Sequence, residues 1–185
     1  MKNVIVVAVL LLSAQLAIGQ KYFSKTGKIS FYSTAALEKI EAHNPSASTV
    51  IDLSTGAMEW AVLIQGFKFE KALMQEHFNE NYMESTKFPK AKFKGKIDNL
   101  TSVNFAKDGE YPVTVSGTME IHGVTKPITS QGTIIVKNGV ITSKSKMSVL
   151  IADYNIEIPK LVADNIAKKV DITIEADYQA MTAMN

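Results

Sequence analysis

The sequence contains no cysteine and no arginine, although the chain has 185 residues and 20 of them are basic. Every basic residue is therefore a lysine. Without cysteine no disulfide can form, so core packing and hydrogen bonds must hold the fold together. Without arginine, bidentate recognition of phosphate or guanine loses its preferred side chain. Because the formal net charge is only +2, we do not expect nucleic acid as a partner.

Long apolar runs are also absent after the first 19 residues. An apolar run at residues 4–12 follows Lys2 and precedes the small residues Ala17 and Gly19. This order predicts a secretory signal peptide, residues 1–19, that is cleaved after Gly19. The run is shorter than the about 20 residues that a membrane span needs, so no integral membrane span is expected. Residues 20–185 should form a single domain, located in the periplasm or secreted.

Alternation of apolar and polar residues dominates the remaining chain. Apolar or small residues occupy every second position over 91–97, 113–121 and 170–178, and lysines and other polar residues occupy the positions between them. This period of two is typical of antiparallel strands with one buried and one solvated face. About eight such strands are expected. Closing them into a barrel would leave no free strand edge.

Turn residues predict how the strands are connected. Asn138-Gly139 is typical of a type I′ turn between strands at 133–136 and 140–148. Residues 123–127 should close the strand that ends at His122, and a bulge at Gly66 should reverse the facing of the apolar residues. A short helix is expected at 34–42, a helix or broken turns at 71–82, and a third short helix at 161–168.

The interior of the barrel allows two interpretations. Large residues such as Phe93 and Met119 share the apolar faces with small ones such as Gly95 and Gly117. Small residues can accommodate large neighbours in a solid core, as in any packed interior. A barrel of about eight strands can alternatively enclose one small ligand. Periodicity alone does not separate the two.

Three segments resemble the YceI-like family. FNENYMESTKFPKAKFKGKI follows His77, GEYPVTVSGTMEIHGVTKPIT spans residues 109–129, and residues 154–159 with the closing strand are similar to the end of the family pattern. The HGVTKP element is the most specific of these. The resemblance implies a lipocalin-like antiparallel barrel with a long apolar channel for a polyisoprenoid chain or a similar amphiphile. The chain departs from the family at 34–42, where we expect a helix and many relatives continue as strand.

The expected function is therefore binding, not catalysis. The chain should bind and carry or store a polyisoprenoid, an isoprenoid quinone or a fatty-acid-like lipid. We expect no catalytic residue, no metal and no cofactor other than a bound lipid, and a homodimer is compatible with the sequence. His77 and His122 are candidates for polar contacts at the mouth of the channel. The residues expected to line the channel are Phe67, Phe69, Leu73, Met74, Phe78, Tyr82, Phe93, Val115, Met119 and Ile121.

Two alternatives remain open. His77 with Glu76 or Glu80 could perform acid–base chemistry on a bound lipid, which requires that the pair face the cavity. A solid-core barrel could act as a partner or stress protein, which exposed apolar patches would favour. On a helix, His77, Glu80 and Glu84 would share a face, as metal ligands do. The favoured interpretation of residues 74–85 is nevertheless a structural element, with Phe78, Tyr82 and Met83 as inward anchors.

Overall fold

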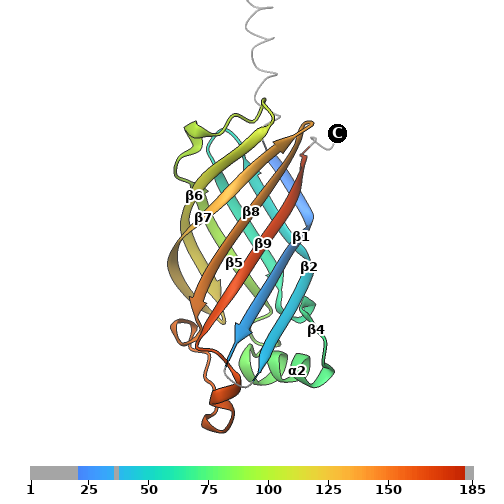
Figure 1. Cartoon of the computed structure of the whole chain (residues 1–185), viewed down its shortest axis with the longest axis vertical. Coiled ribbons are helices and arrows are strands. Elements are labelled where there is room, and N and C mark those ends of the chain that lie inside the picture. The colour runs from blue at the N-terminus through green and yellow to red at the C-terminus, as the bar shows by residue number, and fades with distance from the viewer. Residues whose placement is uncertain (1–20, 36–37, 182–185) are drawn as a thin grey trace, which may run out of the picture.

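The computed structural model describes residues 21–35 and 38–181, and the proposed signal peptide lies outside these residues. The described chain forms a closed barrel of eight antiparallel strands with one extra short strand (Figure 1). The barrel order is β1-β9-β8-β7-β6-β5-β3-β2, and pairing of β1 with β2 closes it. The all-β, antiparallel, closed-barrel prediction is confirmed. The strands are β1 Lys21–Thr34, β2 Lys39–Asp52, β3 Ala57–Leu63, β4 Lys68–Phe69, β5 Lys90–Ile97, β6 Gly109–Ile121, β7 Val124–Lys137, β8 Val140–Leu150 and β9 Lys169–Ala180.

Helical structure is confined to short segments. Helix α2, Ala72–His77, continues into a π-helical turn, Phe78–Tyr82, which confirms the helix expected at 71–82. A 3-10 segment at Lys160–Asn165 stands where the helix at 161–168 was expected. Further 3-10 turns lie at Ile64–Gly66, Leu100–Ser102 and Ile151–Tyr154. No helix among the described residues is long and apolar enough to cross a membrane.

The helix expected at 34–42 is wrong. Strand β1 continues to Thr34 and β2 begins at Lys39, and the two are paired as Thr34↔Lys39 and Phe31↔Ala42. Residues 36–37 lie outside the described part. Ala42 is fully buried, because the alternating positions of β2 face the barrel interior. Cross-strand pairing and burial thus override the local helix propensity of the sequence.

The predicted bulge at Gly66 is a 3-10 turn, Ile64–Gly66. After this turn the chain leaves β3 and β4 pairs with β2 instead. The side chain of Asn44 holds the turn, since its Nδ2 donates to the carbonyl oxygen of Leu63 at 2.9 Å. A Cβ atom on Gly66 would lie 2.5 Å from that Nδ2 atom. Glycine is therefore required here by a close approach.

The two hairpin turns at either end of β7 differ in how well they were predicted. The Asn138-Gly139 turn is confirmed, with φ of 51° and 78° and with Lys137 paired to Val140. The other turn is shorter than predicted, because only His122 and Gly123, at φ 52° and 72°, separate Ile121 from Val124.

Pro127 therefore lies inside β7, opposite Thr118, and not in a turn. Strand β8 pairs with β7 only at Gly132–Lys137, so the backbone of Pro127 has no strand partner on that side. A proline is tolerated in a strand where no ladder hydrogen bond is required of it.

Candidate functional site

A cavity of about 590 Å³ occupies the lower half of the barrel, in the orientation of Figure 1. On β8 its lining extends from Ser143 to Val149, and Ile141, the next inward residue toward the upper end, does not line it. Ile141, Val136 and Tyr178 instead pack in the buried core. Both interpretations of the interior therefore hold, each in one half: the upper half is filled and the lower half is open.

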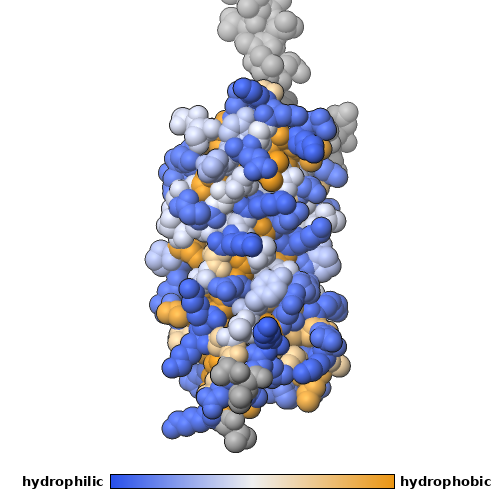
Figure 2. All heavy atoms as spheres, in the orientation of Figure 1, coloured by the Kyte–Doolittle hydropathy of each residue, from blue (hydrophilic) through white to orange (hydrophobic). Residues whose placement is uncertain are grey.

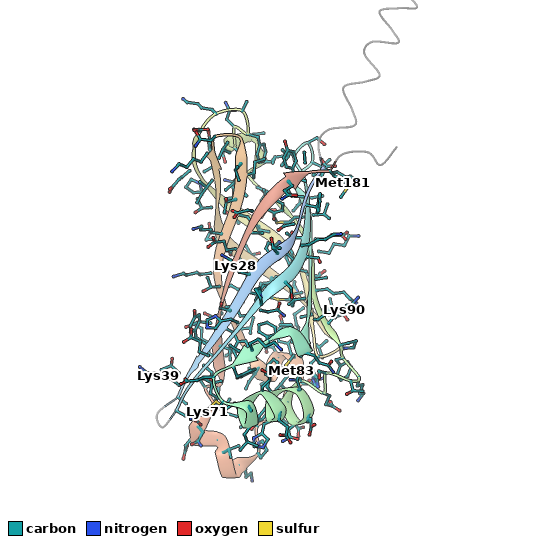
Figure 3. All side chains as sticks on the ribbon, turned by 90° about the vertical axis from the view of Figure 1, so that its right-hand side faces the viewer. Lys28, Lys39, Lys71, Met83, Lys90 and Met181 are labelled. Carbon is teal, nitrogen blue, oxygen red and sulfur yellow. The ribbon has the colours of Figure 1, made fainter. Side chains whose placement is uncertain are left out.

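The mouth of the cavity lies at the lower end of the barrel, where three segments line it. These are the ends of β1 and β2 with Ser33, Glu38 and Ile40, helix α2 with Leu73 and His77, and the 156–166 segment. The ammonium of Lys71 lies 3.2 Å from the carboxylate of Glu38 and joins two of these segments. Figure 3 shows Lys39 and Lys71 at this end, with Met83 above the helix, toward the barrel. The mouth is thus charged, whereas the walls above it are mainly apolar.

All ten residues predicted to contact the ligand line this cavity. Three of them form an aromatic cluster with Phe31 that fastens α2 to the barrel. The ring centroid of Phe78 lies 5.3 Å from Phe31, 5.8 Å from Phe67 and 5.0 Å from Phe69. Such distances are typical of favourable aromatic pairs. Contact of these ten residues with a ligand stays a prediction.

Phe93 lies across a pair of glycines. Gly95 and Gly117 face each other on β5 and β6. A Cβ on Gly117 would lie 2.9 Å from Cε2 of Phe93, and one on Gly95 would lie 2.5 Å from its Cζ. The glycines therefore let the ring lie flat against the wall, so that a large residue lines the cavity without filling it.

Sequence reasoning missed several lining residues. Ile40 was missed because residues 34–42 were interpreted as helix. Phe31 lies on β1, where alternation over 29–33 could have identified it. Trp60, the only tryptophan of the chain, also lines the cavity and was not among the predicted residues. The 151–166 segment carries no periodic signal that predicts its position under the barrel.

The predicted polar residues near the mouth have different positions. His77 lines the cavity, but Glu76 and Glu80 line a separate surface depression with Gln75 and Asn79. The hydrogen bond that holds this part of the helix runs from Asn79 Nδ2 to the carbonyl oxygen of Gln75, at 2.8 Å. The histidine and the two glutamates therefore do not face the same space.

His122 is not among the lining residues. Its Nε2 lies 2.8 Å from the carboxylate of Glu84 and its Nδ1 lies 3.1 Å from the carbonyl oxygen of Tyr154. The ring of Phe88 packs against it edge-on at 4.5 Å. His122 thus links the β6–β7 turn to two segments that flank the lower end of the barrel. Across the described residues, no group of three or more histidine, aspartate or glutamate side chains is placed to hold a metal ion.

Burial raises the pKa of two tyrosines, one at the cavity wall and one in the solid half of the barrel. Desolvation raises the pKa of Tyr82 at the wall. It also raises the pKa of Tyr178 in the solid half, against the smaller effect of the hydrogen bonds between its hydroxyl and those of Ser143 and Thr49. Both phenols therefore stay neutral at physiological pH.

Comparison with known proteins agrees with this architecture. A polyisoprenoid-binding domain from Saccharophagus degradans is similar, with a TM-score of 0.75, 17% identity and coverage of 88% of this chain and 99% of that chain. BcnA from Burkholderia cenocepacia has a TM-score of 0.67 and 16% identity, covering 83% of this chain and 96% of that chain. The Campylobacter jejuni YceI protein has a TM-score of 0.55 and 16% identity, covering 76% and 84%.

At these identities the structural likeness shows the fold alone. No curated protein matches the sequence. The model of the YceI-like domain, however, matches residues 19–178, which is most of the chain. The chain therefore belongs to the YceI-like family.

Proposed function

We propose that the protein binds an amphiphile with a long apolar tail, such as a polyisoprenoid, an isoprenoid quinone or a fatty-acid-like lipid, in its barrel cavity. The observation that carries the proposal is the cavity of about 590 Å³ with its mainly apolar wall. Its volume is within the range of small-molecule sites, roughly 300–1,000 Å³. The similarity to a domain described as polyisoprenoid-binding supports the same ligand class.

Burial of the tail would supply the binding free energy. Each methylene removed from water contributes about 0.8 kcal/mol before the cost of ordering the chain. On β8 the wall from Ser143 to Val149 covers six residue steps, about 20 Å at the usual rise per residue. A tail of several isoprene units can therefore be held without a specific polar contact.

A binding role agrees better with the polar groups than an enzymatic one. Acid–base chemistry on a bound lipid needs His77 paired with a carboxylate at the wall, and Glu38, the glutamate that lines the cavity, is paired with Lys71 at 3.2 Å. Glu76 and Glu80 line the separate surface depression instead. We therefore propose a carrier or storage protein and not an enzyme.

A role as a solid-core partner protein is less favoured by the surface. Figure 2 shows a barrel face that is mostly hydrophilic, with hydrophobic atoms interspersed among hydrophilic ones. Among the described residues the large hydrophobic side chains that are exposed, such as Leu63, Leu73 and Leu150, come from different elements.

We also propose an exported location, in the periplasm or outside the cell, on the basis of the signal-like first 19 residues. Detection of the mature N-terminus at Gln20 in an exported fraction would support it, and an uncleaved chain in the cytosol would contradict it. A homodimer is a separate proposal, which analytical ultracentrifugation of residues 20–185 tests.

The first test of function is native mass spectrometry of residues 20–185 after mild purification, followed by organic extraction. We expect a discrete added mass that extracts as a lipid. An unoccupied protein that also fails to take up isoprenoids or fatty acids on incubation would overturn the proposal.

A blocking variant makes this test specific to the cavity. Ala91 lines the cavity from β5, and Ala91→Phe should place a ring in the space of the tail and abolish the added mass. Lys90→Gln, at the exposed neighbouring position outside the lining, should retain it. Circular dichroism should show the same strand content for both variants.

A further inference from the structure

One stretch of the cavity wall differs chemically from the rest. On β3, β5, β6 and β9 the lining is made of aliphatic, aromatic and sulfur-containing side chains, with Lys92 the exception. On the neighbouring strands β7 and β8, the residues Ser130, Ser143 and Ser145 line the cavity instead. We call these three the serine strip. A hydroxyl next to an apolar space weakens the burial of a purely apolar tail, so packing alone does not account for the strip.

The serine strip extends to the closed end of the cavity. Ser143 is the last inward residue of β8 that lines it, since Ile141 belongs to the solid core. Met147 and Val149 lie further toward the mouth on the same strand. Ser143 is only 8% exposed, so bulk solvent does not compensate its hydroxyl.

The hydrogen bonds of Ser143 leave one proton without an acceptor. The hydroxyl of Tyr178 lies 3.2 Å from Oγ of Ser143 and 3.3 Å from Oγ1 of Thr49. Three hydroxyls carry three protons, and two bonds among them use two. If Thr49 donates to Tyr178 and Tyr178 to Ser143, the third proton is on Ser143 and faces the cavity. If Tyr178 donates to Thr49 and accepts from Ser143, the third proton is left on Thr49; if Tyr178 accepts from both, it is left on Tyr178 itself. Thr49 is 2% exposed, Tyr178 is 4% exposed and neither lines the cavity, so Ser143 is the member of the three whose proton a ligand in the cavity can accept.

The other two serines are already satisfied as donors. Ser145 donates to the carbonyl oxygen of Gln131 at 2.8 Å, and Oγ of Ser130 lies 2.8 Å from Oγ of Ser145. They therefore present acceptor lone pairs to the cavity, whereas Ser143 presents a donor.

The surroundings of Ser143 specify an uncharged partner. The closed end is formed with Met58, Trp60, Val113 and Ile134, which carry no charge. Lys144, the charged lining residue next to Ser143, is exposed and paired with Glu175 at 3.4 Å. Burial of an ionised carboxylate or phosphate there would be strongly unfavourable. A hydroxyl or a carbonyl oxygen would accept the proton of Ser143 at little desolvation cost.

We propose that the amphiphile binds with its uncharged oxygen-bearing end first, accepting a hydrogen bond from Ser143 at the closed end, and with its apolar tail extending toward the mouth. This inference rests on the proposed function, and it assigns the orientation and the chemistry of the head group. It differs from the expectation that the head group contacts His77 at the mouth.

The test compares two probes that differ by one hydroxyl. The isoprenoid alcohol farnesol and the matching hydrocarbon farnesene are titrated into residues 20–185, with the fluorescence of Trp60 as the signal, because this single tryptophan lines the cavity. We expect Ser143→Ala to weaken farnesol binding about 3- to 10-fold and to leave farnesene binding unchanged. Ser148→Ala, an exposed position on the same strand that bonds to Asp171, should change neither.

The orientation of the bound amphiphile is measured separately, with a benzoquinone that carries a tail of two isoprene units. A quinone quenches tryptophan fluorescence only at short range, so binding with the ring at the closed end should quench Trp60 strongly. Binding with weak quenching, together with loss of affinity in His77→Ala and not in Ser143→Ala, would overturn the inference and leave the proposed function intact. If the wild-type protein binds none of the probes, both proposals fail.

Discussion

At the scale of the residue, the glycines under Phe93 set the width of the cavity. Gly95 and Gly117 carry no Cβ, and a Cβ on either would meet the Phe93 ring and the backbone of the facing strand. A methyl group there must displace the ring into the cavity or separate β5 from β6. The two glycine positions that keep the cavity open therefore leave no space for a larger side chain.

We predict that Gly117→Ala lowers the free energy of unfolding by about 1–3 kcal/mol, because the new Cβ would lie 2.6 Å from Cα of Gly95 on the facing strand and 2.9 Å from Cε2 of Phe93. Urea unfolding followed by circular dichroism measures it. Thr118→Ala, at the exposed next position of β6, is the control and should cost less than about 1 kcal/mol. Equal effects of the two would show that the close approach of the glycine to β5 and the Phe93 ring is unimportant.

Burial of the Tyr178 phenol predicts how stability depends on alkaline pH. Desolvation raises its pKa above the ordinary value of 10.0. Above about pH 10 the unfolded chain loses this proton while the folded chain retains it, so stability must fall as the pH rises. Below that range the contribution is fully present.

The measurement is urea unfolding of wild type and Tyr178→Phe between about pH 8 and pH 11. At pH 8 the variant should be less stable by about 1 kcal/mol, since the hydrogen bonds to Ser143 and Thr49 are lost. With increasing pH the wild type should lose stability more steeply than the variant. Parallel curves would contradict the role of Tyr178. Tyr82 and Tyr154, whose pKa values are also raised by burial, contribute equally to both proteins.

At the scale of the element, α2 and its π turn are held to the barrel mainly through Phe78. The segment is short, and its helical residues include no buried one. A helix of this length is not stable by itself in water. Its position therefore depends on the aromatic contacts of Phe78 with Phe31, Phe67 and Phe69.

We predict that Phe78→Ala increases amide hydrogen exchange over residues 72–83 at least tenfold while leaving β7 protected, and lowers global stability by about 2 kcal/mol. Hydrogen exchange with mass spectrometry gives both quantities. Leu73→Ala on the same helix removes a side chain that is 60% exposed and should leave the exchange of the segment nearly unchanged. Uniform loss of protection in all strands would mean that α2 and the barrel unfold as one unit.

At the scale of the whole molecule, the barrel combines a packed upper half with a hollow lower half. The core residues Ile51, Val136 and Ile141 are 0–3% exposed and fill the upper half. The packed half supplies the stability that a chain without disulfides needs, and the lower half leaves room for a ligand. The two halves should therefore respond differently to the same change.

We predict that Ile51→Ala costs about 2–5 kcal/mol, as for a fully buried side chain. Ile172→Ala, which only enlarges a wall that already borders empty space, should cost about 1 kcal/mol in the ligand-free protein. Chemical unfolding of delipidated protein compares them. Addition of a lipid that binds in the cavity should stabilise the wild type by mass action, and it should stabilise the Ile172 variant less. Similar costs for both substitutions without ligand would argue against an open lower half.

The sequence by itself determined the strands, because alternation with period two is a local property of residues such as those at 113–121 and 170–178. It also determined the Asn138-Gly139 hairpin, since φ above zero at both positions is a requirement of the turn residues themselves. The ten predicted residues could be identified from the apolar positions of 67–82 and of two strands, and all of them line the cavity.

Only the tertiary structure decided the remaining features. Residues 34–42 have the local pattern of a helix, and pairing with β1 makes most of them strand. Whether the interior is solid or open depends on which large and small residues face each other across the barrel. The serine strip arises from the register of β7 with β8, which places Gly132 opposite Ser145 and Ile134 opposite Ser143. Such neighbours are distant in sequence, so no local pattern specifies them, and the cavity with its polar end exists only once the barrel has closed.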